Sequence, residues 1–209
     1  MEEKSPMRAD VLLVNGLSET ILDSLSYRTN LGYSLKKNIH YFEKSLVMQE
    51  MASMTNWLYE QDILAEIALD YRIKGMQSIS NKYDRYYPDK QMRQVFNDIL
   101  GFRAFCDSYK QVIELQSNLF RVVDMSTGKR RDDGYRGVHL YYQKDNFHYP
   151  IEIQYNTLYD RQLNNWLHDY VYKKDYPDAV GIRLRQKYES GEIHDEESFV
   201  EVLKCVTSF

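Results

Sequence analysis

The sequence is poor in the residues that cross-link or interrupt a small domain. Among its 209 residues there are 2 cysteines, 4 prolines and 9 glycines. Cys106 and Cys205 are too few and too far apart to frame a disulfide scaffold or a zinc site by spacing, which favours a reducing compartment. Proline and glycine are scattered and no repeat or low-complexity tract occurs, so one continuous fold is expected.

Long apolar runs and a strong net charge are also missing. No stretch approaches the roughly 20 apolar residues of a membrane-spanning helix. The acidic start lacks the basic and apolar segments of a secretory signal, so the expected location is the cytoplasm, without a membrane partner. The formal net charge of -4 means that a nucleic-acid partner would need a local basic patch, whereas a small phosphorylated ligand is compatible with it.

What the sequence does contain is the composition of a folded domain, with 43% hydrophobic residues and 19 tyrosines. Apolar periodicity predicts helices within 18–69, and at 78–86, 91–96, 109–119, 158–173 and from 195 onwards. Strands are predicted at 71–75, 99–106, 120–123, 138–143 and 149–154. The order predicts a mixed α+β fold in one domain, with an N-terminal helical segment 1–69, a core 70–174 and a helical tail 175–209.

Four cations and a hydroxyl gather around the first predicted strand. Arg72 and Lys74 share one strand face, and Ser78, Lys82 and Arg85 share one stripe of the following helix. Cations on both elements at one junction repel each other unless an anion fills the space, which indicates a phosphate site. The alternative is a solvated basic face, which is the commoner environment of any single lysine or arginine.

Two acidic side chains accompany later strands. Asp98 and Arg103 flank Gly101, where a bulge or twist is expected to bring them to a common face, although Asp98 could instead cap the preceding helix. Glu152 and Gln154 share one strand face, as an ordinary solvent-facing strand would also place them. If Asp98 and Glu152 come from neighbouring strands, two acids beside a cation cluster make a Mg²⁺ site.

A glycine-rich basic loop occupies residues 129–139. Gly134 and Gly137 allow tight backbone turns, and Tyr135 offers a flat ring on which a base can stack. The alternative is a flexible basic loop with one packed tyrosine. Candidate phosphate contacts are Arg130, Arg131 and Arg136.

Taken in order, these clusters resemble the synthetase domain of the RelA/SpoT family, and especially its small alarmone synthetases. The resemblance extends from about residue 70 to residue 173. It includes R-x-K-x-x-x-S-x-x-x-K from Arg72 to Lys82, D-I-x-G-x-R from Asp98 to Arg103, G-Y-R-x-x-H from Gly134 to His139, and E-x-Q-x-x-T from Glu152 to Thr157. It implies a nucleotidyltransferase-like fold whose mixed sheet has about five strands flanked by helices.

The resemblance also implies an activity, the transfer of pyrophosphate from ATP to the 3′-hydroxyl of GDP or GTP with release of AMP. Asp98 and Glu152 are the implied catalytic residues and ligands of Mg²⁺, and Glu152 is also a candidate acceptor of the hydroxyl proton. The implied ATP-binding residues are Arg72, Lys74, Ser78, Lys82 and Arg103. The implied acceptor-binding residues are Arg131, Tyr135, Arg136, His139, Gln154 and His168.

The sequence departs from the family pattern on the acceptor side. Gln154-Tyr155-Asn156-Thr157 replaces a common Q-I-R-T, and Leu167-His168 replaces a common Glu-His pair. Alternative acceptors are therefore an adenine nucleotide or the 3′ end of tRNA, as in toxic members of the family that arrest growth. An antitoxin partner is then possible. The low basicity of the chain argues against tRNA. A non-catalytic nucleotide or RNA binder is a further alternative. Homo-oligomer and monomer both remain open.

Overall fold

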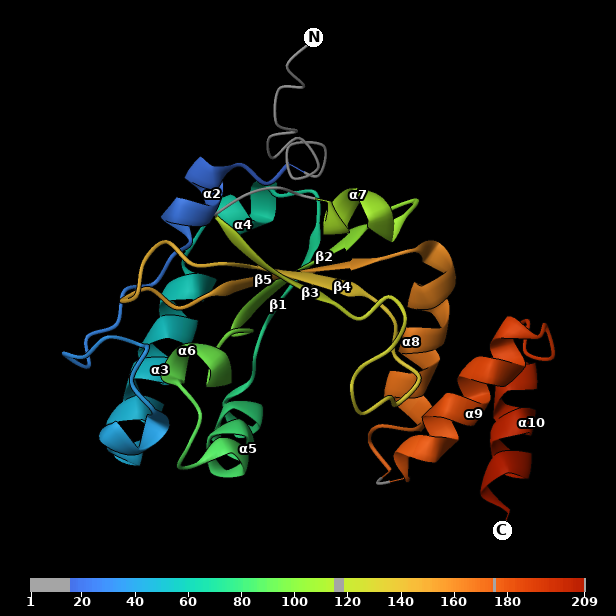
Figure 1. Ribbon diagram of the computed structural model, residues 1–209. Coiled ribbons are helices and arrows are strands. Elements are labelled where there is room, and N and C mark those ends of the chain that lie inside the picture. Colours follow the sequence, from blue (N-terminus) through green and yellow to red (C-terminus); the bar gives the residue numbers. More distant parts are fainter. Residues whose placement is uncertain (1–15, 115–118, 175, 209) are drawn as a thin grey trace, which may run out of the picture. The chain divides into compact units, whose positions relative to one another are not determined.

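The computed structural model describes residues 16–114, 119–174 and 176–208 (Figure 1). Its helices are α2 (Glu19–Ser24), the 3-10 helix η1 (Ile39–Tyr41), α3 (Lys44–Tyr59), α4 (Ile63–Glu66), α5 (Met76–Tyr86), α6 (Met92–Val95), α7 (Tyr109–Ile113), α8 (Leu158–Tyr170), α9 (Asp178–Glu189) and α10 (Glu196–Thr207). Its strands are β1 (Asp70–Ile73), β2 (Leu100–Phe105), β3 (Phe120–Asp124), β4 (Val138–Tyr142) and β5 (Ile151–Asn156). The predicted mixed α+β fold is confirmed, and each predicted strand is present.

The five strands form one mixed sheet in the order β1-β2-β5-β4-β3 (Figure 1). Strand β1 runs antiparallel to β2, with Arg72 opposite Gly101 and Asp70 opposite Arg103. Strand β5, the last along the chain, lies between β2 and β4. This order makes β5, which carries Glu152, the neighbour of β2, the strand that follows Asp98.

The described residues divide into two compact units, 16–104 with 114, 119–122 and 139–154, and 105–113 with 123–138, 155–174 and 176–208. The expectation of one domain over residues 1–209 stays a prediction. Every candidate on the ATP side lies in the first unit. Of the acceptor-side candidates, His139 and Gln154 lie in the first unit, and Arg131, Tyr135, Arg136 and His168 lie in the second.

The first unit has its core beneath one face of the sheet and along α3. Strand alternation buries Leu100, Phe102 and Ala104 of β2 and turns Gly101 and Arg103 to the other face. The same alternation in β4 and β5 buries Leu140, Tyr142, Ile151 and Ile153. The opposite face therefore carries the polar residues of these strands.

One predicted helical stretch in this unit is wrong. Leu35, Ile39, Phe42 and Leu46 have helical spacing and lie within the range 18–69 where helices were predicted, but α3 begins only at Lys44 and Leu46 is 50% exposed. Leu35 lies in an irregular segment, and its own backbone N–H donates to the backbone oxygen of Asn146 (2.8 Å). Leu35, Ile39 and Phe42 are buried, so burial produced the helical spacing without an α-helix, with only the short 3-10 helix η1 in this stretch.

The second unit has a core built by three helices. Helix α8 begins after Thr157, whose hydroxyl accepts from the backbone N–H of Asp160 (3.1 Å). Helix α10 begins at a capping box formed by Asp195 and Ser198, where the sequence predicted a helix from residue 195 onwards. The apolar faces of the three helices meet at Leu163, Leu167, Val180, Leu184, Phe199 and Leu203.

Two expectations from composition can be compared with the structure. In the described ranges, no helix is both long and apolar enough to cross a membrane. Cys106 and Cys205 are both free thiols. Cys106 is half-buried, and burial together with the nearby charges of Asp107 and Asp160 raises the pKa of its thiol to about 11.

Candidate active site

The carboxylate of Asp98 pairs with two lysines near the connection between β1 and α5. The Nζ atoms of Lys74 and Lys82 lie 2.5 Å and 2.9 Å from the two carboxylate oxygens of Asp98. Lys82 also donates to Asn97 Oδ1 (3.1 Å). The strand and helix lysines therefore converge as expected, and the anion between them in the structure is Asp98 itself.

Local folding brings these groups together. The backbone N–H of Lys74 donates to Ile99 O (2.8 Å), which continues the pairing of β1 with β2 by one residue beyond the strand. This bond places Lys74 beside the segment that begins with Asp98. Lys82 lies in α5, in the turn after Ser78.

Arg72 and Arg103 lie on the polar face of the sheet. Antiparallel partners point to the same side, so Arg72 shares the side of Gly101, and alternation puts Arg103 there too. Neither guanidinium has an acidic ion-pair partner in the described part of the chain. Ser78 and Arg85 are exposed on α5, and neither forms a hydrogen bond or an ion pair with Asp98 in the described structure.

The bulge predicted at Gly101 is wrong. Pairing of β1 with β2 runs without interruption from Asp70–Arg103 to Ile73–Leu100. No bulge is needed because Asp98 precedes the strand and is positioned by its two lysines. A Cβ atom at Gly101 would lie 3.5 Å from Glu152 Oε2, so a side chain at this position would be in van der Waals contact with that oxygen.

Glu152 is a buried carboxylate with a hydrogen-bond partner on each oxygen. Its Oε1 accepts from the Tyr141 hydroxyl (2.8 Å) and lies 3.0 Å from His139 Nδ1, and its Oε2 accepts from Gln154 Nε2 (2.6 Å). Since a carboxylate only accepts, the bond to His139 selects the tautomer with a proton on Nδ1. His139 and Gln154 therefore lie around a catalytic candidate.

These bonds determine the charge of Glu152. Burial by itself raises the pKa of Glu152, but the hydrogen bonds from His139, Tyr141 and Gln154 and the charge of His139 outweigh it and lower the pKa to about 2. The side chain is therefore ionised at any pH near neutrality. It is suited to hold a cation.

Tyr141 and Arg121 were not identified from the sequence. Burial and the charge of Glu152 raise the pKa of Tyr141, and the charge of Asp98 adds to this, so the hydroxyl stays protonated and donates. Tyr141 is thus bonded to one of the two acidic candidates, Glu152. The Arg121 guanidinium lies 4.2 Å from the centre of its ring. The signal for Tyr141 was its position two residues after His139, which places both on one strand face.

In the second unit, the structure places the loop candidates in a dense set of contacts. Gly134 has a φ of 88°, which glycine adopts without strain, as predicted from its position. Lys129 Nζ lies 4.8 Å from the centre of the Tyr135 ring. Arg136 forms a bidentate pair with Asp132 at 2.8 Å and 3.0 Å.

The other two acceptor candidates of this unit lie at the surface. Arg131 is exposed and pairs with Asp178, the first residue of α9. His168 is exposed on α8, with Nδ1 3.0 Å from Asp169 Oδ1. The acceptor-binding roles of the loop residues and of His168 stay predictions.

The donor chemistry fits one class of metal site. Across the described residues, no group of three or more His, Cys, Asp or Glu side chains could hold a metal ion. Mg²⁺, however, is usually held by one or two carboxylates together with waters and substrate phosphates. Asp98 and Glu152 fit an ion that binds with a phosphate chain, and they do not fit an all-protein cage.

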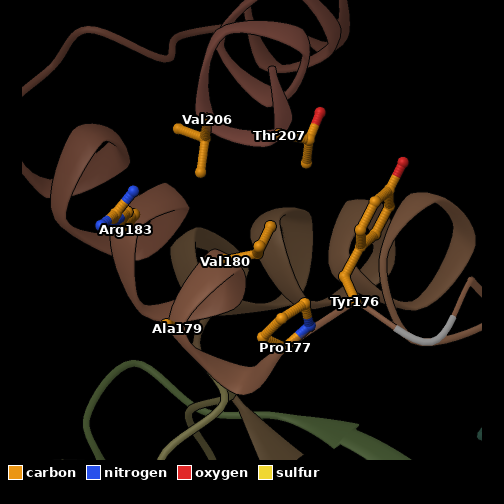
Figure 2. Close-up of a pocket in the computed structure, with 7 residues that line it drawn as sticks. All are labelled: Tyr176, Pro177, Ala179, Val180, Arg183, Val206 and Thr207. Carbon is orange, nitrogen blue, oxygen red and sulfur yellow. The ribbon is translucent and has the colours of Figure 1, made fainter. Parts of the chain in front are cut away.

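An apolar pocket in the second unit is a separate feature (Figure 2). Figure 2 shows Val180 of α9 and Val206 of α10 directed into it. It is lined by Tyr176, Pro177, Ala179, Val180, Arg183, Val206 and Thr207. None of the sequence-predicted site residues lines this pocket, so it is not the candidate active site.

Comparison with known proteins identifies the family. No curated protein sequence matches the chain. Among solved structures it is similar to small alarmone synthetase 1 from Bacillus subtilis, with 24% identity, a TM-score of 0.42, and coverage of 79% of this chain and 97% of that chain. It is also similar to a GTP pyrophosphokinase family protein from Streptococcus pneumoniae, with 21% identity, a TM-score of 0.41, and coverage of 76% and 88%. Residues 71–177, more than half of the chain, match the sequence model of a region found in RelA/SpoT proteins, and the chain therefore belongs to the RelA/SpoT family.

Proposed function

We propose that the chain is a pyrophosphokinase of the alarmone synthetase type, which transfers the β,γ-pyrophosphoryl group of ATP to the 3′-hydroxyl of GDP or GTP and releases AMP. Family membership supports a synthetase of this type. The observation that carries the proposal is the pairing of Lys74 and Lys82 with Asp98, which precedes β2, the strand next to the one that holds Glu152. Two acids and two lysines are the groups that a metal-bound triphosphate requires.

The ATP phosphates would replace Asp98 as partners of the lysines. Phosphate oxygens compete for both ammonium groups, which frees the Asp98 carboxylate to hold Mg²⁺ together with Glu152. When bound, the ion neutralises charge on the phosphate chain and helps to orient it for in-line attack. Arg72 and Arg103, which have no acidic ion-pair partner among the residues that the structure describes, would supply further positive charge.

Between the two roles open for Glu152, the metal-ligand role has the stronger support. A general base is most effective when its pKa lies near the working pH. The hydrogen bonds that lower the pKa of Glu152 to about 2 make it a weak proton acceptor. The same bonds from His139, Tyr141 and Gln154 keep it charged and orient it.

The reaction is tested by a single assay with several acceptors. The protein is incubated with Mg²⁺ and ATP labelled on the γ-phosphate, together with GDP, GTP, ADP or tRNA in separate reactions. We expect AMP and a labelled guanosine 3′-pyrophosphate from GDP and GTP, and no reaction when the divalent cation is chelated. If only ADP or only tRNA becomes labelled, that molecule is the acceptor. If no AMP forms with any of the four acceptors, the proposal is overturned.

Tyr135→Ala is expected to weaken acceptor binding selectively. Stacking of a base on an aromatic ring contributes about 1–3 kcal/mol, which corresponds to a rise of about 5- to 150-fold in the acceptor KM. The KM for ATP should not change, because the ATP-side residues belong to the other unit. Initial rates at varied acceptor concentration measure this effect. An acceptor KM equal to that of the unmodified protein would exclude the stacking role.

A further inference from the structure

Helix α9 begins where the family region ends, and its buried face contacts the loop that carries Tyr135. Arg185 is only 1% exposed although it is charged. Its Nε donates to the backbone oxygen of Gly134 (2.9 Å), the residue that precedes Tyr135. Its Nη1 and Nη2 donate to Asp160 Oδ1 (2.6 Å) and Asn164 Oδ1 (3.3 Å) of α8. One guanidinium thus joins the loop to two helices.

A second contact is made by backbone alone. A Cβ atom added at Gly181 of α9 would lie 2.0 Å from the backbone oxygen of Asp133, a distance at which something must move. A Cβ atom at Gly134 would in turn lie 2.4 Å from the backbone oxygen of Gly181. The loop and the helix therefore approach so closely that neither position accommodates a side chain.

Further bonds hold the main chain on both sides of Tyr135. Asn164 accepts from the backbone N–H of Arg136 (3.2 Å) and donates to its backbone oxygen (2.7 Å). The hydroxyl of Tyr172 donates to the backbone oxygen of Asp133 (3.2 Å). With Gly134 held by Arg185, the backbone of the residues before and after Tyr135 is tied to α8, α9 and the segment between them.

We propose that α9 positions Tyr135 for the acceptor nucleotide, and that Arg185 and Gly181 are positioning residues. The proposal rests on the proposed function, in which Tyr135 stacks on the acceptor base. A glycine with positive φ is a flexible point in a loop, so the direction of the tyrosine ring depends on what holds that backbone. The planar fork of arginine can serve three acceptors at once, and a lysine at the same place cannot reproduce this arrangement.

Gly181→Ala tests the backbone contact without altering Arg185. The added methyl group must displace Asp133, so we expect the acceptor KM to rise by about 10- to 100-fold while the KM for ATP is unchanged. Arg185→Lys should give a smaller rise in the acceptor KM than Arg185→Met. The exposed neighbour Gln186 provides the control, since Gln186→Ala should behave as the unmodified protein.

The decisive measurement combines Gly181→Ala with Tyr135→Ala. If α9 acts through Tyr135, Gly181→Ala should change the acceptor KM little when Tyr135 is already absent. GDP is also titrated into each protein without ATP, and calorimetry measures the Kd for GDP. This Kd should rise in the same variants in which the acceptor KM rises. An equal effect of Gly181→Ala in both backgrounds, or an equal rise in both KM values, would overturn the proposal by showing a general structural effect.

The outcomes also separate this proposal from the function on which it rests. If the unmodified protein forms no AMP with any acceptor, the proposed function fails. If it transfers pyrophosphate and both Gly181→Ala and Arg185→Met keep its acceptor KM, the proposed function stands and the positioning role of α9 is refuted. Where the acceptor proves to be another nucleotide, that nucleotide replaces GDP in the titration.

Discussion

Glu152→Gln and Asp98→Asn are each expected to lower the rate of AMP formation by at least about 100-fold. Both changes keep the shape of the side chain and remove its negative charge, so each variant would lose one of the two proposed ligands of Mg²⁺. In the Asp98→Asn protein, Lys74 and Lys82 also lose their common anionic partner. Initial rates of AMP release from ATP with GDP, at saturating Mg²⁺, measure the effect.

Two exposed acids of the same unit provide matched controls. Glu60 follows the end of α3 and Asp89 lies between α5 and α6, and both side chains are exposed. Glu60→Gln and Asp89→Asn remove the same charges away from the candidate site and should leave the rate unchanged. Circular dichroism should show that all four variants are folded. Full activity of both site variants would mean that the active centre has been misidentified.

The strands were predictable because their signals are local. In β2, apolar residues alternate with Gly101 and Arg103, and this alternation depends on the sheet having one buried face. The stretch from Leu35 to Leu46 was misread because an irregular segment that is held by backbone hydrogen bonds to other parts of the chain can bury apolar residues at helical spacing. Periodicity indicates burial, and it identifies a helix only when no other path of the chain can bury the same side chains.

The candidate site was predictable where one strand–turn–helix unit builds it. Lys74 and Lys82 converge because β1 leads directly into α5, and both positions follow from short-range spacing. The lysines' bonds to Asp98 and the bond from Tyr141 to Glu152 depend on which strands become neighbours, and no local pattern contains that order. The bulge at Gly101 was wrong for a related reason, since it assumed that Asp98 belonged to the strand.

Arg185 was the least predictable functional candidate. It lies far along the chain from Gly134, so only tertiary structure brings them together. A signal was nevertheless present, because Arg185 falls among Val180, Leu184 and Tyr188, the buried residues of α9. A charged residue on the apolar side of a helix requires a buried partner, although the sequence does not say which acid supplies it.

Arg185→Met should lower the free energy of unfolding by about 3–5 kcal/mol, because it leaves the carboxylate of Asp160 buried without its cation. The oxygens of Gly134 and Asn164 also lose their donor. Urea denaturation followed by fluorescence measures the loss. Lys187→Met, which breaks an exposed ion pair with Glu192 on the same stretch of chain, should leave the midpoint unchanged.

A double-variant cycle shows whether the ion pair is the cause. Asp160→Asn alone leaves Arg185 buried with an uncompensated charge. Asp160→Asn combined with Arg185→Met removes both charges. The asparagine keeps an oxygen that can accept from the Tyr109 hydroxyl. The double variant should therefore be more stable than the sum of the two single losses implies, by at least about 1 kcal/mol. Strictly additive losses would mean that Arg185 stabilises the fold through packing and backbone bonds, with no contribution from its pairing with Asp160.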